Sequence, residues 1–79
     1  MAEPLTDTQV TAKIRHYENQ IRRNLLNIDT RQIGFEMGEI TEDELLFTIE
    51  DAKAIRGMVT LMISFLEREH NRRCNDGTF

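Results

Sequence analysis

The sequence has few residues that interrupt helices. It contains four glycines and one proline, and that proline, Pro4, precedes the first predicted helix. No run of β-branched residues is long enough to form a strand. Because Gly and Pro break helices and β-branched runs mark strands, these absences exclude a strand-rich fold and predict an all-α chain.

Cysteine and long apolar runs are also scarce. A lone cysteine, Cys74, cannot form a disulfide within the chain, so we expect a reducing, cytoplasmic location. A disulfide between two chains is the alternative. The N-terminal residues MAEPLTD have neither a basic segment nor an apolar run, so no signal peptide is predicted. The longest apolar stretch, residues 58–66, is far shorter than the roughly 20 residues that cross a bilayer, so we expect no membrane contact.

The sequence lacks the motifs of common enzymes and cofactor sites. It has no Gly-rich phosphate loop, no nucleophile elbow and no Cys-x-x-Cys pair. Glu67 and His70 have the Glu-x-x-His spacing of di-iron bundles, but the first predicted helix adds only Glu18, at the edge of its apolar face. His70 and Cys74 are one helical turn apart, but zinc needs two more ligands. We therefore expect no catalytic residue, no cofactor and no metal site.

The chain does contain one short pattern three times: LTDTQV, IDTRQI and ITEDEL, at residues 5–10, 28–33 and 40–45. Each begins with an apolar residue and Thr or Asp, and ends with Glu or Gln and an apolar residue. This is a capping box with a hydrophobic staple, in which side chains pair with the first free N–H groups of a helix. It predicts helix starts at Thr6 and Thr41.

These signals, with Gly38 as a stop for the first helix, predict one helix over residues 6–37 and another over residues 41–73. Two long helices joined by about three residues fold back as an antiparallel hairpin. We expect a single hairpin domain over residues 6–73. A flexible N-terminus (residues 1–5) and a flexible C-terminal tail (residues 74–79) would flank it.

The copy of the pattern at Asp29 leaves two interpretations open. A true cap would break the first helix there and start a short helix that reaches Met37. Alternatively, apolar residues at heptad spacing run through Ile28 to Phe35, in one unbroken helix with Asp29 at its surface. We favour the unbroken helix.

Each predicted helix carries an apolar stripe suited to the contact between the two. On the first helix the stripe comprises Val10, Ile14, Tyr17, Ile21, Leu25, Ile28 and Phe35. On the second helix it comprises Leu45, Ile49, Ala52, Ile55, Val59, Met62, Ile63 and Leu66. We expect these two stripes to face each other.

A second apolar face remains after these stripes are assigned, and it comprises Leu26, Ile33, Met37, Phe47, Ala54, Met58, Leu61 and Phe65. A helix that is apolar on two opposed sides is normally buried on both, and one hairpin partner covers only one side. The simplest cover is a second copy related by a two-fold axis, which gives a four-helix bundle. Residues 29–37 of the same chain, or a different protein, are the alternatives. Gly57 would fit a close approach of helices there.

Charge is distributed unevenly along the chain, whose net charge is −4. Half of the 14 acids lie between Gln32 and Ala52, where no Lys or Arg occurs, and the hairpin gathers them at its turn. Helix starts favour acids for their own dipoles, so the acidic turn also fits ordinary helices. The opposite end collects basic residues that could bind nucleic-acid phosphates: Lys13, Arg15, Arg22, Arg23, Arg68, Arg72 and Arg73.

Taken together, these features predict a non-enzymatic protein that acts by protein–protein interaction through apolar helix faces. A regulator, adaptor, inhibitor or small chaperone fits this description. Its anchors would be Phe47, Met58, Leu61 and Phe65, because Met and Phe suit a surface that adapts to a partner. The alternative is a dimeric four-helix bundle that binds nucleic acid through its basic end.

Overall fold

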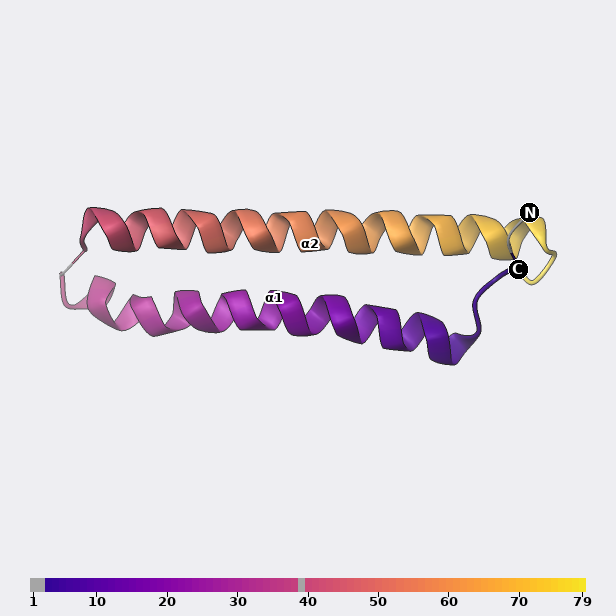
Figure 1. The fold of residues 1–79 in the computed structure, drawn as a ribbon, viewed down its shortest axis with the longest axis horizontal. Helices are drawn as coiled ribbons and strands as arrows, with labels where there is room; N and C mark the ends of the chain where they lie inside the picture. The colour runs from indigo at the N-terminus through magenta and orange to yellow at the C-terminus, as the bar shows by residue number, and fades with distance from the viewer. Residues whose placement is uncertain (1–2, 39) are drawn as a thin grey trace.

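The computed structural model describes residues 3–38 and 40–79. Its two helices, α1 (Asp7–Glu36) and α2 (Glu42–Asn75), lie side by side and antiparallel, joined by a short turn (Figure 1). They form a rod with extents of 56 × 18 × 15 Å. No strand occurs in these described ranges. The predicted all-α hairpin of two long helices is therefore confirmed.

Both predicted helix starts are confirmed by their caps. The Thr6 side chain accepts a hydrogen bond from the Gln9 N–H at 3.2 Å, and the Gln9 side chain accepts one from the Thr6 N–H at 2.9 Å. This is a complete capping box. At α2, the Thr41 side chain accepts from the Glu44 N–H at 3.2 Å.

Glycines in the left-handed conformation end both helices. Gly38 has φ of +78° and Gly77 has φ of +79°, which residues with a Cβ rarely adopt. Thr78 N–H donates to the Arg73 carbonyl and Gly77 N–H to the Cys74 carbonyl, the two bonds of a Schellman motif. As a result α2 extends to Asn75, two residues past its predicted end.

Helix α1 runs unbroken through Asp29. The hydroxyl of the next residue, Thr30, donates to the Leu26 carbonyl at 2.9 Å, which is a common way to place Thr inside a helix. The continuous interpretation is therefore confirmed. Residues 29–36 continue along α2 as part of α1 and do not fold over another face (Figure 1).

The α1 side of the contact is the predicted one, with one exception. The residues that turn towards α2 are buried or half-buried: Val10, Ile14, Tyr17, Ile21, Ile28 and Phe35. Leu25 was also expected there, but it is 46% exposed.

The α2 side of the contact was predicted wrongly. The residues that face α1 recur at heptad spacing: Glu44, Thr48, Asp51, Ile55, Met58, Met62, Phe65 and Glu69. Ile55 and Met62 of the predicted stripe lie at this contact, and Val59 is half-buried beside it. The other predicted members lie exposed beside it: Leu45, Ile49, Ala52, Ile63 and Leu66. The helix is therefore rotated by about one residue from the orientation that its apolar pattern favours.

The apolar core of the hairpin is small. Among the described residues, Tyr17 and Phe65 are the buried hydrophobic ones, with 8% and 7% of their surface exposed. Their ring centroids lie 6.3 Å apart, with the rings tilted by 51°. Such aromatic pairs contribute beyond the area they bury.

Phe65→Ala should strongly destabilise the hairpin, by up to about 3–5 kcal/mol, because it removes half of the aromatic pair. The same change at exposed Phe47 (54% exposed) should cost much less. Urea unfolding followed by circular dichroism measures both variants. Equal losses would show that the Tyr17–Phe65 pair is not the centre of the core.

Gly57→Ala should stabilise α2 by roughly 0.5–1 kcal/mol, because Gly is a poor residue for a helix interior. A Cβ built at Gly57 has no neighbour within 4 Å, so the chain itself has room for it. Gly77→Ala, by contrast, should destabilise, because φ is +79° there. Thermal unfolding of the two variants tests this; a lower melting temperature for Gly57→Ala would mean that another molecule approaches this position.

Candidate protein-interaction surface

A polar cluster fixes α2 against α1 in the half of the hairpin near the turn. Arg31 Nη1 lies 2.6 Å from Asp51 Oδ2 and donates to the Thr48 hydroxyl at 3.3 Å. The Arg31–Asp51 contact is an ion pair that is not aligned as a hydrogen bond. The two charged side chains are only 22% and 14% exposed, and the guanidinium lies over the Phe47 ring. Asp51 therefore faces α1 although it is charged.

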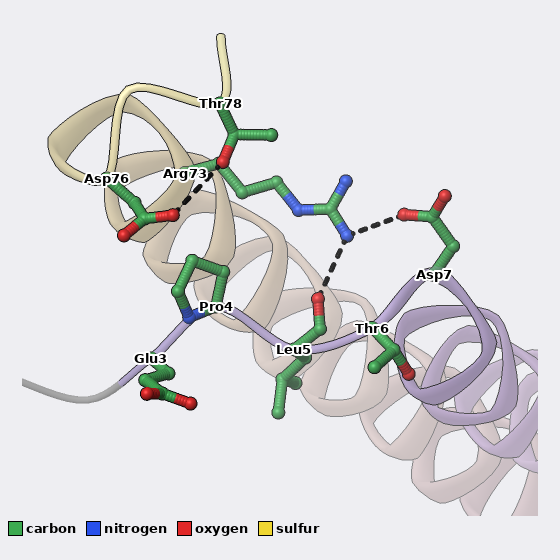
Figure 2. A pocket seen from close by; sticks show the side chains of 8 residues that line it. All are labelled: Glu3, Pro4, Leu5, Thr6, Asp7, Arg73, Asp76 and Thr78. Carbon is green, nitrogen blue, oxygen red and sulfur yellow. Dashed lines mark hydrogen bonds and ion pairs between the residues drawn. The ribbon is translucent and has the colours of Figure 1, made fainter.

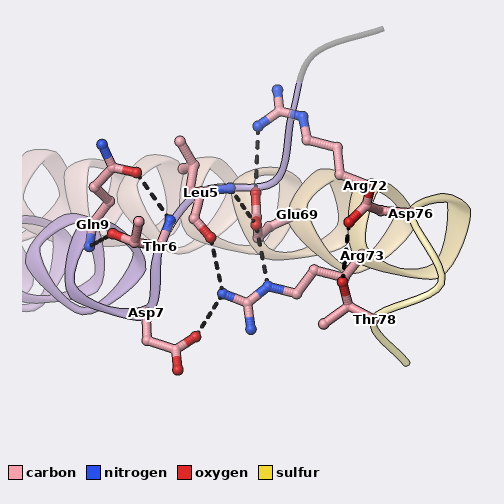
Figure 3. A network of polar contacts seen from close by, with 9 residues as sticks. All are labelled: Leu5, Thr6, Asp7, Gln9, Glu69, Arg72, Arg73, Asp76 and Thr78. Atoms are coloured by element: carbon pink, nitrogen blue, oxygen red, sulfur yellow. Dashed lines mark hydrogen bonds and ion pairs between the residues drawn. The ribbon is translucent and has the colours of Figure 1, made fainter.

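A second polar cluster closes the open end of the hairpin around Glu69 (Figure 3). This carboxylate is 4% exposed and accepts hydrogen bonds from the Leu5 N–H at 2.8 Å and from Arg73 Nε at 3.2 Å. Arg72 donates to its other oxygen at 3.4 Å. Arg73 also donates to the Leu5 carbonyl and to Asp7, at 3.2 and 2.8 Å. We call this set the Glu69 latch, because it holds the segment before α1 against the end of α2.

The latch shifts the protonation equilibria of both of its central groups. Burial alone would raise the pKa of the Glu69 carboxyl, but the hydrogen bonds from Arg73 and the Leu5 N–H, with the charge of Arg73 and the bond from Arg72, hold it below its ordinary value of 4.5. The hydrogen bonds from Arg73 to Asp7 and Glu69 raise the pKa of its guanidinium. Both groups are therefore kept charged.

A shallow hollow lies between the segment before α1 and the end of α2 (Figure 2). Its lining includes Glu3, Asp7 and Asp76 beside a single guanidinium, Arg73, which already donates to Leu5 and Asp7. Among the described residues that line the hollow, no cation is therefore left over to bind an anion. The shape of the hollow follows from the latch.

Glu69→Gln should reduce the loss of stability in acid. The folded-state pKa lies below the unfolded value, so the carboxylate stabilises the fold fully above pH 4.5 and loses this effect as the pH falls through the folded pKa. At neutral pH the variant should be less stable than wild type. Urea unfolding at several pH values measures this, with exposed Glu67→Gln as the matched control. An identical acid response in Glu69→Gln and wild type would contradict it.

The predicted second face does not form one surface. Phe65 is buried and Met58 half-buried, and both face α1. Phe47, Ala54 and Leu61 are exposed and recur every seven residues along one side of α2. The remaining residues lie on the outer side of α1: Leu26, Ile33 and Met37, which are 59%, 65% and 70% exposed. Helical rotation therefore separates the predicted face into three parts.

The structure exposes a surface that the sequence prediction had placed in the core. On the side of α2 opposite Phe47 and Leu61 lies a continuous apolar row, which we call the outer seam: Leu45, Ile49, Ala52, Val59, Ile63 and Leu66. All but half-buried Val59 are exposed. The regular heptad spacing of these residues was visible in the sequence, but it was assigned to the contact with α1.

The apolar surface left in water is unusually large for a chain of this size. Among the described residues, thirteen large hydrophobic side chains are exposed. The accessible surface is 6153 Å², whereas a compact monomer of 9.3 kDa exposes about 5000 Å². The total accessible surface therefore exceeds that of a compact chain by about 1200 Å², as an elongated rod requires. Soluble monomers rarely leave large contiguous apolar patches uncovered.

The basic residues do not gather into one free patch at the open end. Arg72 and Arg73 bind Glu69, and Lys13 lies over the Tyr17 ring at 5.4 Å. Arg22 lies 3.9 Å from Glu18. The other predicted nucleic-acid contacts are exposed: Arg15, Arg23 and Arg68. At the turn, one predicted acidic residue, Glu39, lies outside the described residues.

The candidate metal ligands come together only in part. The Cys74 sulfur lies 3.8 Å from His70 Nε2, and the ring of His70 lies near that of Phe79. Across the described residues, no three His, Cys, Asp or Glu side chains are grouped as metal ligands would be. In the same part of the chain, neither helix offers an apolar stretch that could cross a bilayer.

Comparison with known proteins identifies no relative of this chain. No family model, curated protein or solved structure matches the chain. The exposed apolar surface of α2, with that of α1, is thus the feature from which a function is to be inferred.

Proposed function

We propose that this chain is a small non-enzymatic protein that acts by protein–protein interaction through the apolar faces of its hairpin. The observation that carries the proposal is that thirteen large hydrophobic side chains are exposed among the described residues, whereas the buried ones are Tyr17 and Phe65. A cytoplasmic regulator, adaptor, inhibitor or small chaperone would use such a surface. In a reducing cytoplasm, exposed Cys74 would stay a thiol.

Energetics support self-association as part of this function. Burying one Leu, Ile, Met or Phe side chain contributes about 1.5–3 kcal/mol before ordering costs. A domain of this size has a small net stability, so a few such side chains matter greatly. Two hairpins that pack together would form a four-helix bundle, in which each layer covers the other.

Nucleic-acid binding has weaker support as the alternative function. Arg72 and Arg73, two of its seven predicted contacts, are held by Glu69 within the latch. A phosphate would have to compete with that carboxylate for them. The exposed basic residues that remain are spread along the rod rather than grouped.

Sedimentation equilibrium over a wide range of concentration tests the proposed function. We expect a mass above 9.3 kDa and a melting temperature that rises with protein concentration, as mass action requires for an oligomer. A monomer with a concentration-independent melting temperature would contradict self-association.

The same samples titrated with a short RNA and a short DNA duplex test the alternative. Binding that weakens steeply with salt and is lost in a double Arg22→Ala, Arg23→Ala variant would favour nucleic acid over protein as the partner. Little binding at physiological salt is the result that the proposed function predicts.

A further inference from the structure

We propose that the outer seam of α2 is the docking site for a second copy of this chain, and that the two α2 helices pack there antiparallel. This inference rests on the proposed function and specifies which surface and which orientation it uses. Neither was part of the sequence prediction, which placed the seam inside the hairpin.

The spacing of the outer seam suits a second helix. From Leu45 to Leu66 its members are separated alternately by four and three residues, with Arg56 filling the central position. This is the heptad pattern with which helices pack knobs into holes. Each residue of the seam directly follows, in the sequence, a residue of the row that contacts α1, so the two rows lie side by side on α2. Helix α2 therefore carries two adjacent heptad rows, and α1 occupies one of them.

The neighbouring row of α1 cannot cover the seam. Asp7 and Arg73 contact each other on the side of the hairpin that carries the seam, and Arg31 and Phe47 contact each other on the opposite side. On the seam side, the exposed row of α1 is polar apart from one residue: Arg15, Glu18, Arg22, Leu25, Asp29 and Gln32. Leu25 adds to the apolar surface of the seam, whereas the polar residues of this row do not cover the seam. The helix that does have a matching free row is α2 of another copy.

The exposed area agrees with what a stable dimer needs. A standard protein interface buries about 800 Å² on each partner. The hairpin exposes about 1200 Å² more than a compact chain of its mass, which is more than one such interface covers on each copy. The same patch on both copies gives the isologous interface of a two-fold dimer.

Charge favours the antiparallel orientation, because residues 32–52 hold seven acids and no Lys or Arg. A parallel pair would bring two such acidic ends together, whereas an antiparallel pair places them at opposite ends of the dimer. Like charges brought together across an interface are unfavourable.

The order of residues in the seam is compatible with this orientation. From either end the seam begins with Leu and Ile, and Ala52 and Val59 flank its middle. An antiparallel copy therefore presents side chains of similar size along most of the contact. Arg56 lies at its middle, where its long stem can cover apolar surface while the guanidinium reaches water.

The test compares two neighbouring residues on opposite sides of α2. Ile63 of the seam and Leu61 outside it are 48% and 51% exposed, so Ile63→Asp and Leu61→Asp introduce the same charge at similar cost to the hairpin. We expect Ile63→Asp to weaken dimerisation at least tenfold by sedimentation equilibrium, and Leu61→Asp to leave it nearly unchanged. Ile49→Asp and Phe47→Asp form a second matched pair. Equal effects within a pair, or a larger effect of Leu61→Asp, would overturn the assignment of the seam.

Two controls keep the outcomes distinct. Circular dichroism reports whether each variant stays helical, and the milder pair Ile63→Ala and Leu61→Ala replaces the charged pair if one unfolds. A wild-type chain that is monomeric at every concentration would refute the self-association in the proposed function as well. A wild-type dimer broken by Leu61→Asp alone would leave the proposed function standing and refute the seam.

Spin labels test the orientation. In a Cys74→Ser background, a label at exposed Glu67→Cys should lie roughly 30 Å or more from its counterpart along the axis of an antiparallel dimer, since α-helices rise 1.5 Å per residue. In a parallel dimer the two labels would be neighbours. A short distance between them would overturn the antiparallel arrangement.

Discussion

The pairing of buried charges across the two helices decides which side of α2 lies inside the hairpin. Asp51 and Glu69 both face α1: Asp51 pairs with Arg31 of α1, and Glu69 accepts hydrogen bonds from the Leu5 N–H before α1 and from Arg73 of its own helix. Buried charges are costly unless they are paired, and their hydrogen bonds are directional. Because these two clusters lie in opposite halves of the rod, together they fix the rotation of α2 against α1.

This rotation determines what remains on the surface. The hydrophobic effect depends on the area removed from water and has no preferred direction. Rotating α2 by about one residue therefore costs little apolar burial, because it replaces one apolar row at the contact with the adjacent one. Met58, Met62 and Phe65 take the place against α1, and the row from Leu45 to Leu66 moves outside. The hairpin thereby keeps both polar clusters, the Arg31–Asp51 cluster and the Glu69 latch, and leaves an apolar surface for another molecule to cover.

A single layer of two helices has little interior, and a folded domain normally has at least two layers around its core. Here Tyr17 and Phe65 form the buried apolar centre, and most other large apolar residues lie on the outside. A function based on association would supply the missing layer while using the same surface for recognition. The charge-rich turn and the latched open end would then set how copies align, since electrostatic complementarity contributes mainly to orientation and specificity.

The sequence by itself determined the features that depend on neighbours a few residues apart. Thr6 and Thr41 cap their helices through residues three positions on, Gly38 ends α1 locally, and the stripe from Val10 to Phe35 follows from helical periodicity. Only the tertiary structure decided which of two rows of α2 meets α1. Those rows differ by one residue, and the choice depends on Asp51 meeting Arg31 and on Glu69 meeting the Leu5 N–H, both distant along the chain. Assigning the stripe from the apolar pattern alone therefore placed it one residue away from the row of α2 that meets α1, and with it the candidate interaction surface.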